Sequence, residues 1–412
     1  MRIGYFVWEY PPRLVGGLGT YADEMTGIFA KLKHNVSVFT LNPDNLKTSE
    51  IINNIEVHRP KVVDAVDVLP MIISNELIRW GAGLKFFNDI FSYNYLSASK
   101  FINQVAEKKK FDIVAIHDWL SAIAGLIIKK TKPELPLVFH VHSTEQQRSI
   151  NGSHIIKEIE FKMAKQADMI ITVSYSMREH LIQLGYPKDK IKVVWNGCDP
   201  DVYNPKKVDS RSVDNLRNAY KINKDEKVIF FIGRLTWIKG VENLILAFSE
   251  VLKKFPKTKL IILGKGEEYD DLVELSKRLD IADKIVIRSA FVTEKERIAH
   301  YALSDVCVFP SFSEPFGIVS LEAMSMEKPV VVGASGINGF KEQIIPSGDE
   351  RCGVHVDGRK PEDIAWGIEE VLKNPERAKQ WARNARKRVE EYFSLEKVAK
   401  STLNFYKECT KI

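Results

Sequence analysis

The chain has 412 residues, of which 45% are apolar and 28% are charged. This length allows two or three domains, each with its own core, and excludes a single small module. The net charge is +6. Because the basic residues are spread evenly along the chain, the composition gives no support for nucleic acid as a partner.

No stretch approaches the ~20 consecutive apolar residues that a membrane-spanning helix needs, so stable insertion into a membrane is not expected. The first apolar run begins at residue 3 and has strand character, without the charged head and cleavage site of a signal peptide. The four cysteines stand far apart, at Cys198, Cys307, Cys352 and Cys409. We therefore expect a cytoplasmic protein with reduced thiols, without a disulfide framework or a structural zinc.

In the first half of the chain, short runs rich in Val, Ile and Phe alternate with longer amphipathic stretches. A helix is predicted at 21–33, and the predicted strands cover residues 3–8, 36–40, 112–117, 137–142, 169–174 and 191–195. Apolar strands joined by helical crossovers are typical of a parallel, doubly wound sheet.

The pattern breaks at residues 196–200 and stays polar until about residue 223. Strands are then predicted at 228–233, 259–264, 284–291, 306–310, 329–333 and 353–356. We therefore predict an α/β fold with two Rossmann-like doubly wound domains, 1–197 and 198–390, which face each other across a cleft. Residues 391–412 are predicted to form a helix that crosses back to the first domain. Ligands of such sheets bind beyond the carboxyl ends of the strands, so candidate site residues are expected there.

The first predicted strand leads into Gly16-Gly17-Leu18-Gly19, and a helix is expected to start near Thr20 or Tyr21. Because glycine lacks Cβ, a ligand can approach the backbone, and a helix N-terminus attracts anions. These residues match neither GxGxxG nor the P-loop pattern. A tight turn that needs a positive φ is therefore an equal alternative.

Arg234 and Lys239 follow the first strand of the second half, just before a helix predicted at Val241–Lys254. A diphosphate needs its charge neutralised, and Arg offers a bidentate fork while Lys offers a point charge. This spacing therefore predicts an anion site. The alternative is a pair of solvated loop charges.

The segment EPFGIVSLE, from Glu314 to Glu322, follows the strand predicted at 306–310. Pro315 is expected near a helix start, which would leave the next backbone N–H groups free, namely those of Gly317, Ile318 and Val319. Glu314 precedes this helix and Glu322 is expected about two turns into it. The two carboxylates therefore suit different parts of an extended ligand, and for either one alone a cap or a surface Glu is the alternative.

Polar residues also end two neighbouring predicted strands, as His117-Asp118-Trp119 and as HVHSTE at 140–145. Strand alternation places His140 and His142 on one face, and His140, which lies deeper, can be a core histidine. We favour His142 as the functional one. Zinc binding is the competing hypothesis, but no third ligand cluster at metal-like spacing accompanies the pair.

Two short motifs are not interpreted as sites. Residues 333–337 lack the last glycine of GxSxG, which disfavours a serine hydrolase. The DxD at 199–201 lies in the polar break, where we expect a hinge near residues 196–225, and it is interpreted as a turn.

Together these segments resemble the retaining glycosyltransferases of family 4, which have two Rossmann domains (the GT-B fold), and among them archaeal glycogen-synthase-like members. The resemblance covers nearly the whole chain. It rests on WEYPPRLVGGLGTYADEM (8–25), HDW (117–119), HVHSTE (140–145), TVSYSMREHL (172–181), VVWNGCDPDVYNP (193–205), FIGRLTWIKG (231–240), ILGKGEE (262–268), PSFSEPFGIVSLEAM (310–324) and KPVVV (328–332). The combination of Glu-x7-Glu with Arg-x4-Lys is its most specific part.

The resemblance implies a role for each candidate residue. Arg234 and Lys239 would bind the donor diphosphate, a task that a metal performs in other transferases. Glu314 would hold sugar hydroxyls, and His142 would contact the donor sugar. The other implied roles are Gly16 and Gly17 for the diphosphate and sugar, Gly317 and Ile318 beside the sugar, Val319 for the phosphates, Glu322 for the ribose, Phe291 and Thr293 for the base, and Asp118 on the acceptor side.

The resulting hypothesis is a metal-independent, cofactor-free transfer of glucose from ADP- or UDP-glucose to a glycan acceptor, an α-1,4-glucan, with retention of configuration. The alternatives are a lipid or small-molecule acceptor, a sugar-nucleotide epimerase, and a non-catalytic sugar-nucleotide or glycan-binding protein. Residues 336–339 and Ser143 depart from the family pattern, which leaves the sugar and the acceptor open. The amphipathic stretch 75–88 either touches a membrane acceptor, lines the acceptor side or packs on the core. The sequence does not indicate an oligomeric state.

Overall fold

The computed structural model describes residues 1–14, 16–43, 45–67, 83–148, 152–290 and 292–411. The chain forms two compact units. The first unit comprises Met1–Val173, Arg178–Val194 and Val398–Ile412, and the second comprises Ser174–Met177 and Trp195–Lys397. Each unit is built on one sheet.

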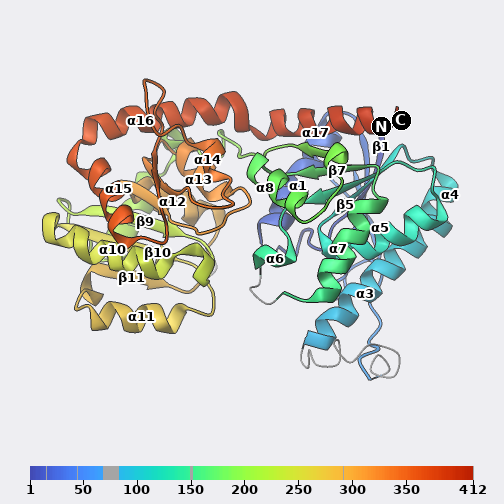
Figure 1. Cartoon of the computed structure of the whole chain (residues 1–412), viewed down its shortest axis with the longest axis horizontal. Helices are drawn as coiled ribbons and strands as arrows, with labels where there is room; N and C mark the ends of the chain where they lie inside the picture. Colours follow the sequence, from blue (N-terminus) through green and yellow to red (C-terminus); the bar gives the residue numbers. More distant parts are fainter. Residues whose placement is uncertain (15, 44, 68–82, 149–151, 291, 412) are drawn as a thin grey trace. The chain divides into compact units, whose positions relative to one another are not determined.

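The first unit has an eight-stranded sheet in the described part of the chain, with the order β3-β4-β2-β1-β5-β6-β7-β8. Figure 1 labels β1, β5 and β7 of this sheet. Its strands are β1 (Arg2–Phe6), β2 (Asn35–Phe39), β3 (Ser49–Ile52), β4 (Ile55–His58), β5 (Ile113–His117), β6 (Leu137–Val141), β7 (Met169–Thr172) and β8 (Ile191–Val193). All neighbours pair in parallel except β3 and β4. The central strands β5 and β6 are buried along their whole length, as expected for a sheet covered on both faces.

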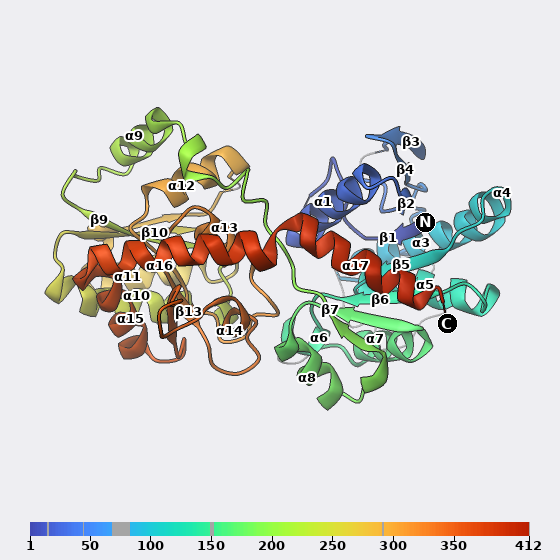
Figure 2. The ribbon, with the colours of Figure 1, turned by 90° about the horizontal axis from the view of Figure 1, so that it is seen from above.

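Helices connect and cover these strands. They are α1 (Gly17–Lys31), α3 (Gly83–Lys100), α4 (Ala106–Lys108), α5 (Trp119–Thr131), α6 (Glu145–Arg148), α7 (His154–Gln166), α8 (Tyr175–Gln183), which begins in the second unit, and α17 (Leu395–Cys409). Apolar residues of α1 and of α17 pack in one core with β1, β2, β5, β6 and β7. Figure 2 shows α17 lying along the strands of this unit. Helices α1 and α17, near the two ends of the chain, therefore cover the same face of the first sheet.

The second unit has a six-stranded parallel sheet in the described residues, with the order β11-β10-β9-β12-β13-β14. Its strands are β9 (Lys227–Ile232), β10 (Thr258–Leu263), β11 (Ile285–Arg288), β12 (Val306–Phe309), β13 (Val330–Gly333) and β14 (Val354–Val356). Its helices are α9 (Ser210–Ala219), α10 (Val241–Lys254), α11 (Tyr269–Arg278), α12 (Glu294–Leu303), α13 (Ile318–Ser325), α14 (Phe340–Gln343), α15 (Pro361–Lys373) and α16 (Pro375–Arg388). On this sheet α10 packs against α11 and α15 (Figure 1).

The α/β class with doubly wound sheets is confirmed, and every strand predicted from the sequence overlaps a strand of the structure. The sequence analysis missed β3 and β4. Both are four residues long, and β3 is an edge strand whose side chains are exposed or half-buried, so it lacks the apolar run used to find strands.

The segment Ser174–Met177 lies in the second unit, although the chain around it belongs to the first. The Ser174 hydroxyl donates to the Pro315 carbonyl at 2.7 Å. The Glu342 carboxylate accepts hydrogen bonds from the backbone N–H groups of Tyr175 and Ser176 at 3.0 and 2.8 Å. These bonds hold the start of α8 on the second unit.

Candidate functional site

In the second unit, three loops converge at the carboxyl ends of β9, β12 and β13. The loop after β9 carries Arg234 and Lys239 and ends at Gly240, which has a φ of +68°. A Cβ on Gly240 would stand 2.5 Å from the Pro310 carbonyl oxygen, so this loop packs closely on the loop after β12. Glycine is needed here by both the backbone conformation and the packing.

Glu314 lies where the loops meet. Its backbone N–H donates to Ile337 at 3.1 Å, and its carbonyl accepts from Gly339 at 2.8 Å, which pairs it with the loop after β13. Its side chain forms an ion pair with Lys239, and the Ser311 hydroxyl lies 3.4 Å from the same carboxylate oxygen. The structure therefore brings together Lys239 and Glu314, which lie 75 residues apart in the sequence.

Arg234 lies in the same loop as Lys239 but has a different environment. Its side chain is exposed, and it forms no ion pair or hydrogen bond with any residue that the structure describes. Its five N–H donors are therefore free to bind an anion.

Helix α13 begins at Ile318, three residues after Pro315, so Pro315 lies near the helix start as expected. Gly317 is the N-cap residue with a φ of +88°, and a Cβ on it would stand 2.1 Å from the Phe340 ring. The cap therefore sits close against α14. The first N–H groups of a helix have no partner within it, so those of Ile318 and Val319 point out of the helix start.

Glu322 is the fifth residue of α13, about one turn in rather than two, and it is buried. Its two carboxylate oxygens accept hydrogen bonds from Tyr203 at 2.9 Å and Tyr301 at 2.7 Å, and Arg297 lies 3.4 Å away. Burial, reinforced by the Glu322 charge, raises the pKa of both tyrosines, so both remain O–H donors. Glu322 is thus part of a buried network, whereas Glu314 pairs with the loop lysine.

Of the two residues assigned to the base, the structure describes only Thr293, because Phe291 lies outside the described residues. Thr293 is the N-cap of α12, and its hydroxyl accepts from the Glu296 N–H at 3.3 Å. Its hydroxyl therefore already has a structural partner.

In the first unit, the glycine segment forms the start of α1 rather than a loop before it. The helix begins at Gly17, and Gly16 is the N-cap with a φ of −155° and an N–H that donates to Glu9 at 2.9 Å. Neither residue has a positive φ, so the tight-turn alternative does not hold here. A Cβ on Gly16 or Gly17 would meet no atom of the described residues within 4 Å, so both glycines border open space in this part of the structure.

Asp118 and His142 follow β5 and β6. Asp118 is buried, and its carboxylate accepts from the backbone N–H of His142 at 2.7 Å. Its own N–H donates to the His140 carbonyl at 2.9 Å. Asp118 therefore fixes the backbone of the next strand end, while the His142 side chain remains partly exposed.

The sequence analysis named His117 at a strand end but did not group it with the HxH pair. His117, at the end of β5, is paired in register with His140 on β6. The ring nitrogens of His117, His140 and His142 lie within 4.8 Å of one another. Comparing His117 with its neighbour on the adjacent strand, rather than along the chain, would have grouped the three histidines.

The ring planes show how these histidines are arranged. His117 and His140 stack with centroids 4.3 Å apart and planes 21° apart. A metal ion lies in the plane of each imidazole that binds it, because the nitrogen lone pair does, so two face-to-face rings do not share one ion. Burial, with a contribution from neighbouring imidazoles, lowers the pKa of His117 and His140 well below the ordinary value of 6.5. Both histidines are therefore neutral near pH 7.

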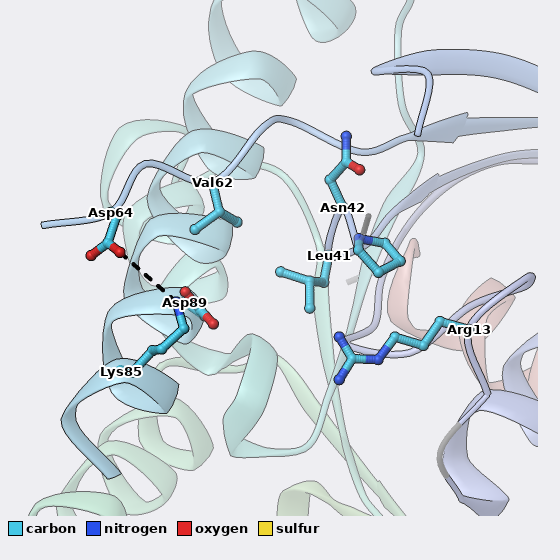
Figure 3. A pocket seen from close by; sticks show the side chains of 8 residues that line it. Arg13, Leu41, Asn42, Val62, Asp64, Lys85 and Asp89 are labelled. Carbon is cyan, nitrogen blue, oxygen red and sulfur yellow. Dashed lines mark ion pairs between the residues drawn. The ribbon is translucent and has the colours of Figure 1, made fainter. Parts of the chain in front are cut away.

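A cavity of about 340 Å³ opens beside the loops after β2 and β4 in the first unit. Figure 3 shows its lining, in which Lys85 faces Asp64 at 3.9 Å. It is lined by Arg13, Leu41, Asn42, Pro43, Val62, Asp64, Lys85 and Asp89. Polar and charged side chains of both signs suit a hydroxylated ligand rather than an apolar one.

Within the amphipathic stretch 75–88, residues 75–82 lie outside the described residues. Beyond it, α3 buries Leu84 and Phe87, while Phe86 is 45% exposed and contacts Trp8. The described part therefore packs on the core. Among the helices of the described residues, none is long and apolar enough to cross a membrane. The four cysteines are buried and unbridged.

Two protein-family models match this chain. Glycosyltransferase Family 4 matches residues 15–202, and Glycosyl transferases group 1 matches residues 212–388. Each match spans one of the two predicted Rossmann-like domains.

Several relatives match nearly the whole chain. An uncharacterized glycosyltransferase of Methanocaldococcus jannaschii is 32% identical over 419 residues, which is 99% of this chain and 98% of the relative. The glycogen synthase of Mycobacterium tuberculosis is 26% identical over 98% of this chain and 94% of its own length.

Two solved structures share the fold. Sucrose-phosphate synthase from Thermosynechococcus elongatus has a TM-score of 0.78 at 19% identity, over 99% of this chain and 98% of that chain. Anabaena HepE in complex with UDP-glucose has a TM-score of 0.75 at 19% identity, over 99% and 100%. The GT-B type of fold expected from the sequence is thus confirmed.

Proposed function

The chain belongs to the group 1 glycosyltransferases, and we propose that it moves a glucosyl group from ADP- or UDP-glucose to a hydroxyl of an α-1,4-glucan, with retention of configuration. The observation that carries the donor assignment is the pair of cations Arg234 and Lys239 in the loop after β9, at the carboxyl edge of the second sheet. A diphosphate leaving group needs its developing charge stabilised, and preorganised cations do this without reorganisation.

The two cations have different tasks in this proposal. Arg234, which has no ionic partner among the described residues, binds the diphosphate through its fork of N–H donors. Lys239 forms an ion pair with Glu314. A bound diphosphate carries enough negative charge to replace Glu314 as the partner of Lys239. Glu314 is then released to accept hydrogen bonds from sugar hydroxyls, beside the N–H groups at the start of α13.

The family resemblance assigns further residues of each unit to the donor. The open space at Gly16 and Gly17 lets the donor approach the start of α1. His142, partly exposed at the end of β6, contacts the sugar. Glu322 takes the ribose through acceptor positions that Tyr203 and Tyr301 leave open, since each carboxylate oxygen has two lone pairs.

The proposed chemical step needs no metal or other cofactor, because two cations neutralise the leaving diphosphate. The bond between the anomeric carbon and the donor phosphate oxygen breaks, while a bond to the acceptor oxygen forms on the same face. The acceptor's hydroxyl proton passes to the leaving phosphate. The role of the protein in this step is positioning and charge stabilisation.

The glucan acceptor is supported by the name of one relative, the mycobacterial glycogen synthase. UDP-glucose is supported by its presence in the Anabaena HepE structure. The polar cavity beside β2 and β4 suits a hydroxylated acceptor.

The donor site is tested by nucleotide release from ADP-glucose and UDP-glucose with Arg234→Ala and Lys239→Ala. We expect turnover to fall by about 10²–10³-fold in each, the usual cost of removing one electrostatic stabiliser of a leaving group. Lys257→Ala is the matched control, since Lys257 is an exposed cation just before β10, at the opposite end of the same sheet. If both site variants fold and both keep near-normal turnover, the assignment of the donor site is wrong.

The acceptor is tested by running the same assay with glycogen, with a small sugar phosphate and with no acceptor. Release that depends on glycogen, with a lengthened glucan as product, supports the proposal. Release that depends on the small acceptor replaces the glucan by a small molecule. Conversion of the donor to an epimer without any acceptor contradicts glycosyl transfer.

A further inference from the structure

The strand-end histidines of the first unit are joined by one hydrogen bond. Nδ1 of His117 lies 3.1 Å from Nε2 of His142. Their ring centroids are 5.4 Å apart and their planes differ by 24°, so the rings meet edge to edge and the hydrogen bond lies near both planes. A buried histidine is thereby connected to a partly exposed one.

The His117 ring is fixed from both sides. The Tyr5 ring lies 4.1 Å away and the His140 ring 4.3 Å away, measured between centroids. Because β5 lies between β1 and β6 in the sheet, these rings flank His117 on opposite sides. His140 is itself held by the Tyr406 hydroxyl of α17 at 2.7 Å. The direction in which His117 meets His142 is therefore set by the core.

The protons of this pair can be counted. Burial lowers the pKa of both histidines, although Asp118 partly opposes this shift in His142, so each ring carries one N–H and one acceptor nitrogen. Only one proton then lies in the contact between them, and either ring can donate it.

The other nitrogen of His117 decides between these arrangements. Nε2 of His117 is buried and has no hydrogen-bond partner in the described part of the chain. If His142 donated, His117 would carry its proton on this buried nitrogen, without an acceptor. Buried N–H groups without a partner are rare, because they forfeit the hydrogen bond that water would give.

We propose that His117 is a positioning residue that donates its Nδ1–H to Nε2 of His142 and so holds His142 in the tautomer with its proton on Nδ1. His142 then offers an N–H donor at the strand end. The consequence of this tautomer for catalysis rests on the proposed function. Because the His142 imidazole donates a hydrogen bond, it selects an oxygen of the donor sugar that accepts one.

The tautomer is read directly from the full chain labelled with ¹⁵N in histidine, by long-range ¹⁵N–¹H correlation spectra. The His142 signals are identified by their loss in His142→Gln. We expect a protonated Nδ1 and an unprotonated Nε2 in the unaltered protein. A proton on Nε2 of His142 overturns the proposal.

Two variants separate the hydrogen bond from the packing. His117→Phe keeps a flat ring in the stack but removes the donor, and we expect His142 to shift toward the tautomer with its proton on Nε2. Tyr5→Phe removes a hydroxyl that has no partner among the described residues, so it should leave the His142 tautomer unchanged. An unchanged tautomer in a folded His117→Phe overturns the proposal. If that variant does not fold, the spectrum of the unaltered protein still decides.

Kinetics test the positioning role. In His117→Phe we expect kcat to fall about tenfold, which corresponds to about 1.4 kcal/mol, while KM for the donor changes less than threefold because the diphosphate dominates binding. His117→Asn keeps an N–H donor near the position of Nδ1 and should recover part of kcat. An unchanged kcat alongside a changed tautomer overturns the role. If no donor is turned over at all, the proposed function fails while the spectrum still tests the tautomer.

Discussion

The two units use the same kind of parallel sheet, but they stabilise the polar ends of their strands by different means. In the second unit, opposite charges meet in the loops after the strands, with Lys239 against Glu314. In the first unit, the strand ends carry neutral imidazoles that stack and share hydrogen bonds. The difference teaches that one sheet architecture supports either ionic or neutral recognition, depending on the side chains at its carboxyl edge.

Their glycines differ in the same way. Gly240 and Gly317 of the second unit have positive φ and no room for a Cβ, so the fold itself requires them. Gly16 and Gly17 of the first unit have extended or helical backbone and face open space. Gly240 and Gly317 are therefore structural, whereas Gly16 and Gly17 leave room for a ligand.

The largest expected effect is that of Gly317→Ala. Its Cβ would lie 2.1 Å from the Phe340 ring at a φ of +88°, so we expect a loss of about 3 kcal/mol in the free energy of unfolding. Calorimetry should show it as a lower transition temperature. Adding Phe340→Leu should restore part of the loss by making space. A Gly317→Ala protein as stable as the original would contradict this account of the second unit.

The next largest effect is expected from breaking the ion pair between Lys239 and Glu314. Lys239 and Glu314 are only 17% and 11% exposed, so Lys239→Met leaves a largely buried carboxylate without its cation. We expect a loss of about 2–3 kcal/mol in stability, and the double variant Lys239→Met, Glu314→Gln should recover more than half of it. Denaturant unfolding of the four proteins measures the coupling. Additive losses would show that the pair is not a stabilising unit.

For the first unit, the corresponding prediction concerns how the free energy of unfolding depends on pH. His117 and His140 have lowered pKa values in the folded state, so below their ordinary value of 6.5 the unfolded chain binds protons that the folded chain does not. Stability should therefore fall as the pH drops below about 6.5, by up to about 1.4 kcal/mol per pH unit for each histidine.

Unfolding by urea between pH 7.5 and 5.5 measures this dependence. The matched variant is His117→Phe, which lacks one neutral histidine and should lose less stability over the same range. Parallel curves for the two proteins would show that His117 is not kept neutral by the fold.

The smallest effect on stability is expected for Gly17→Ala. Because its Cβ meets no atom and alanine favours a helix, stability should stay the same or rise slightly. Transferase turnover should nevertheless fall at least tenfold, since the methyl group fills space left for the donor. Gly27→Ala, in the same helix and also unobstructed, is the control and should keep full turnover. Equal turnover in both variants would remove Gly17 from the site.

Much of the fold follows from local patterns. Helix α10 spans Val241–Lys254 as predicted, because its apolar residues recur at helical spacing and Gly240 precedes it. The start of α1 was misplaced by three to four residues, because glycines discourage a helix prediction, whereas Glu9 holds the N–H of Gly16 and stabilises the first turn. Local propensity cannot anticipate such a contact.

The candidate site, like the fold, has one part that sequence patterns predict and another part that they do not. That Lys239 and Glu314 would both lie at the carboxyl edge of the second sheet followed from the sequence, whereas their ion pair did not. The partnership of His117 with His142 did not, because it depends on the register of two strands and on ring orientations. The network around Glu322 was equally hidden, since its tyrosines lie 119 and 21 residues away.

The sequence by itself determined the α/β class, the restart of the sheet after a polar break, and the ordered motifs that identify the family, because each is written in short segments. Only the tertiary structure decided that residues 174–177 belong to the second unit and that Tyr406 of α17 supports His140, 266 residues away. The physical reason is that a hydrogen bond or a stacked ring depends on positions in space. Residues far apart along the chain acquire those positions only when the sheets and helices have packed.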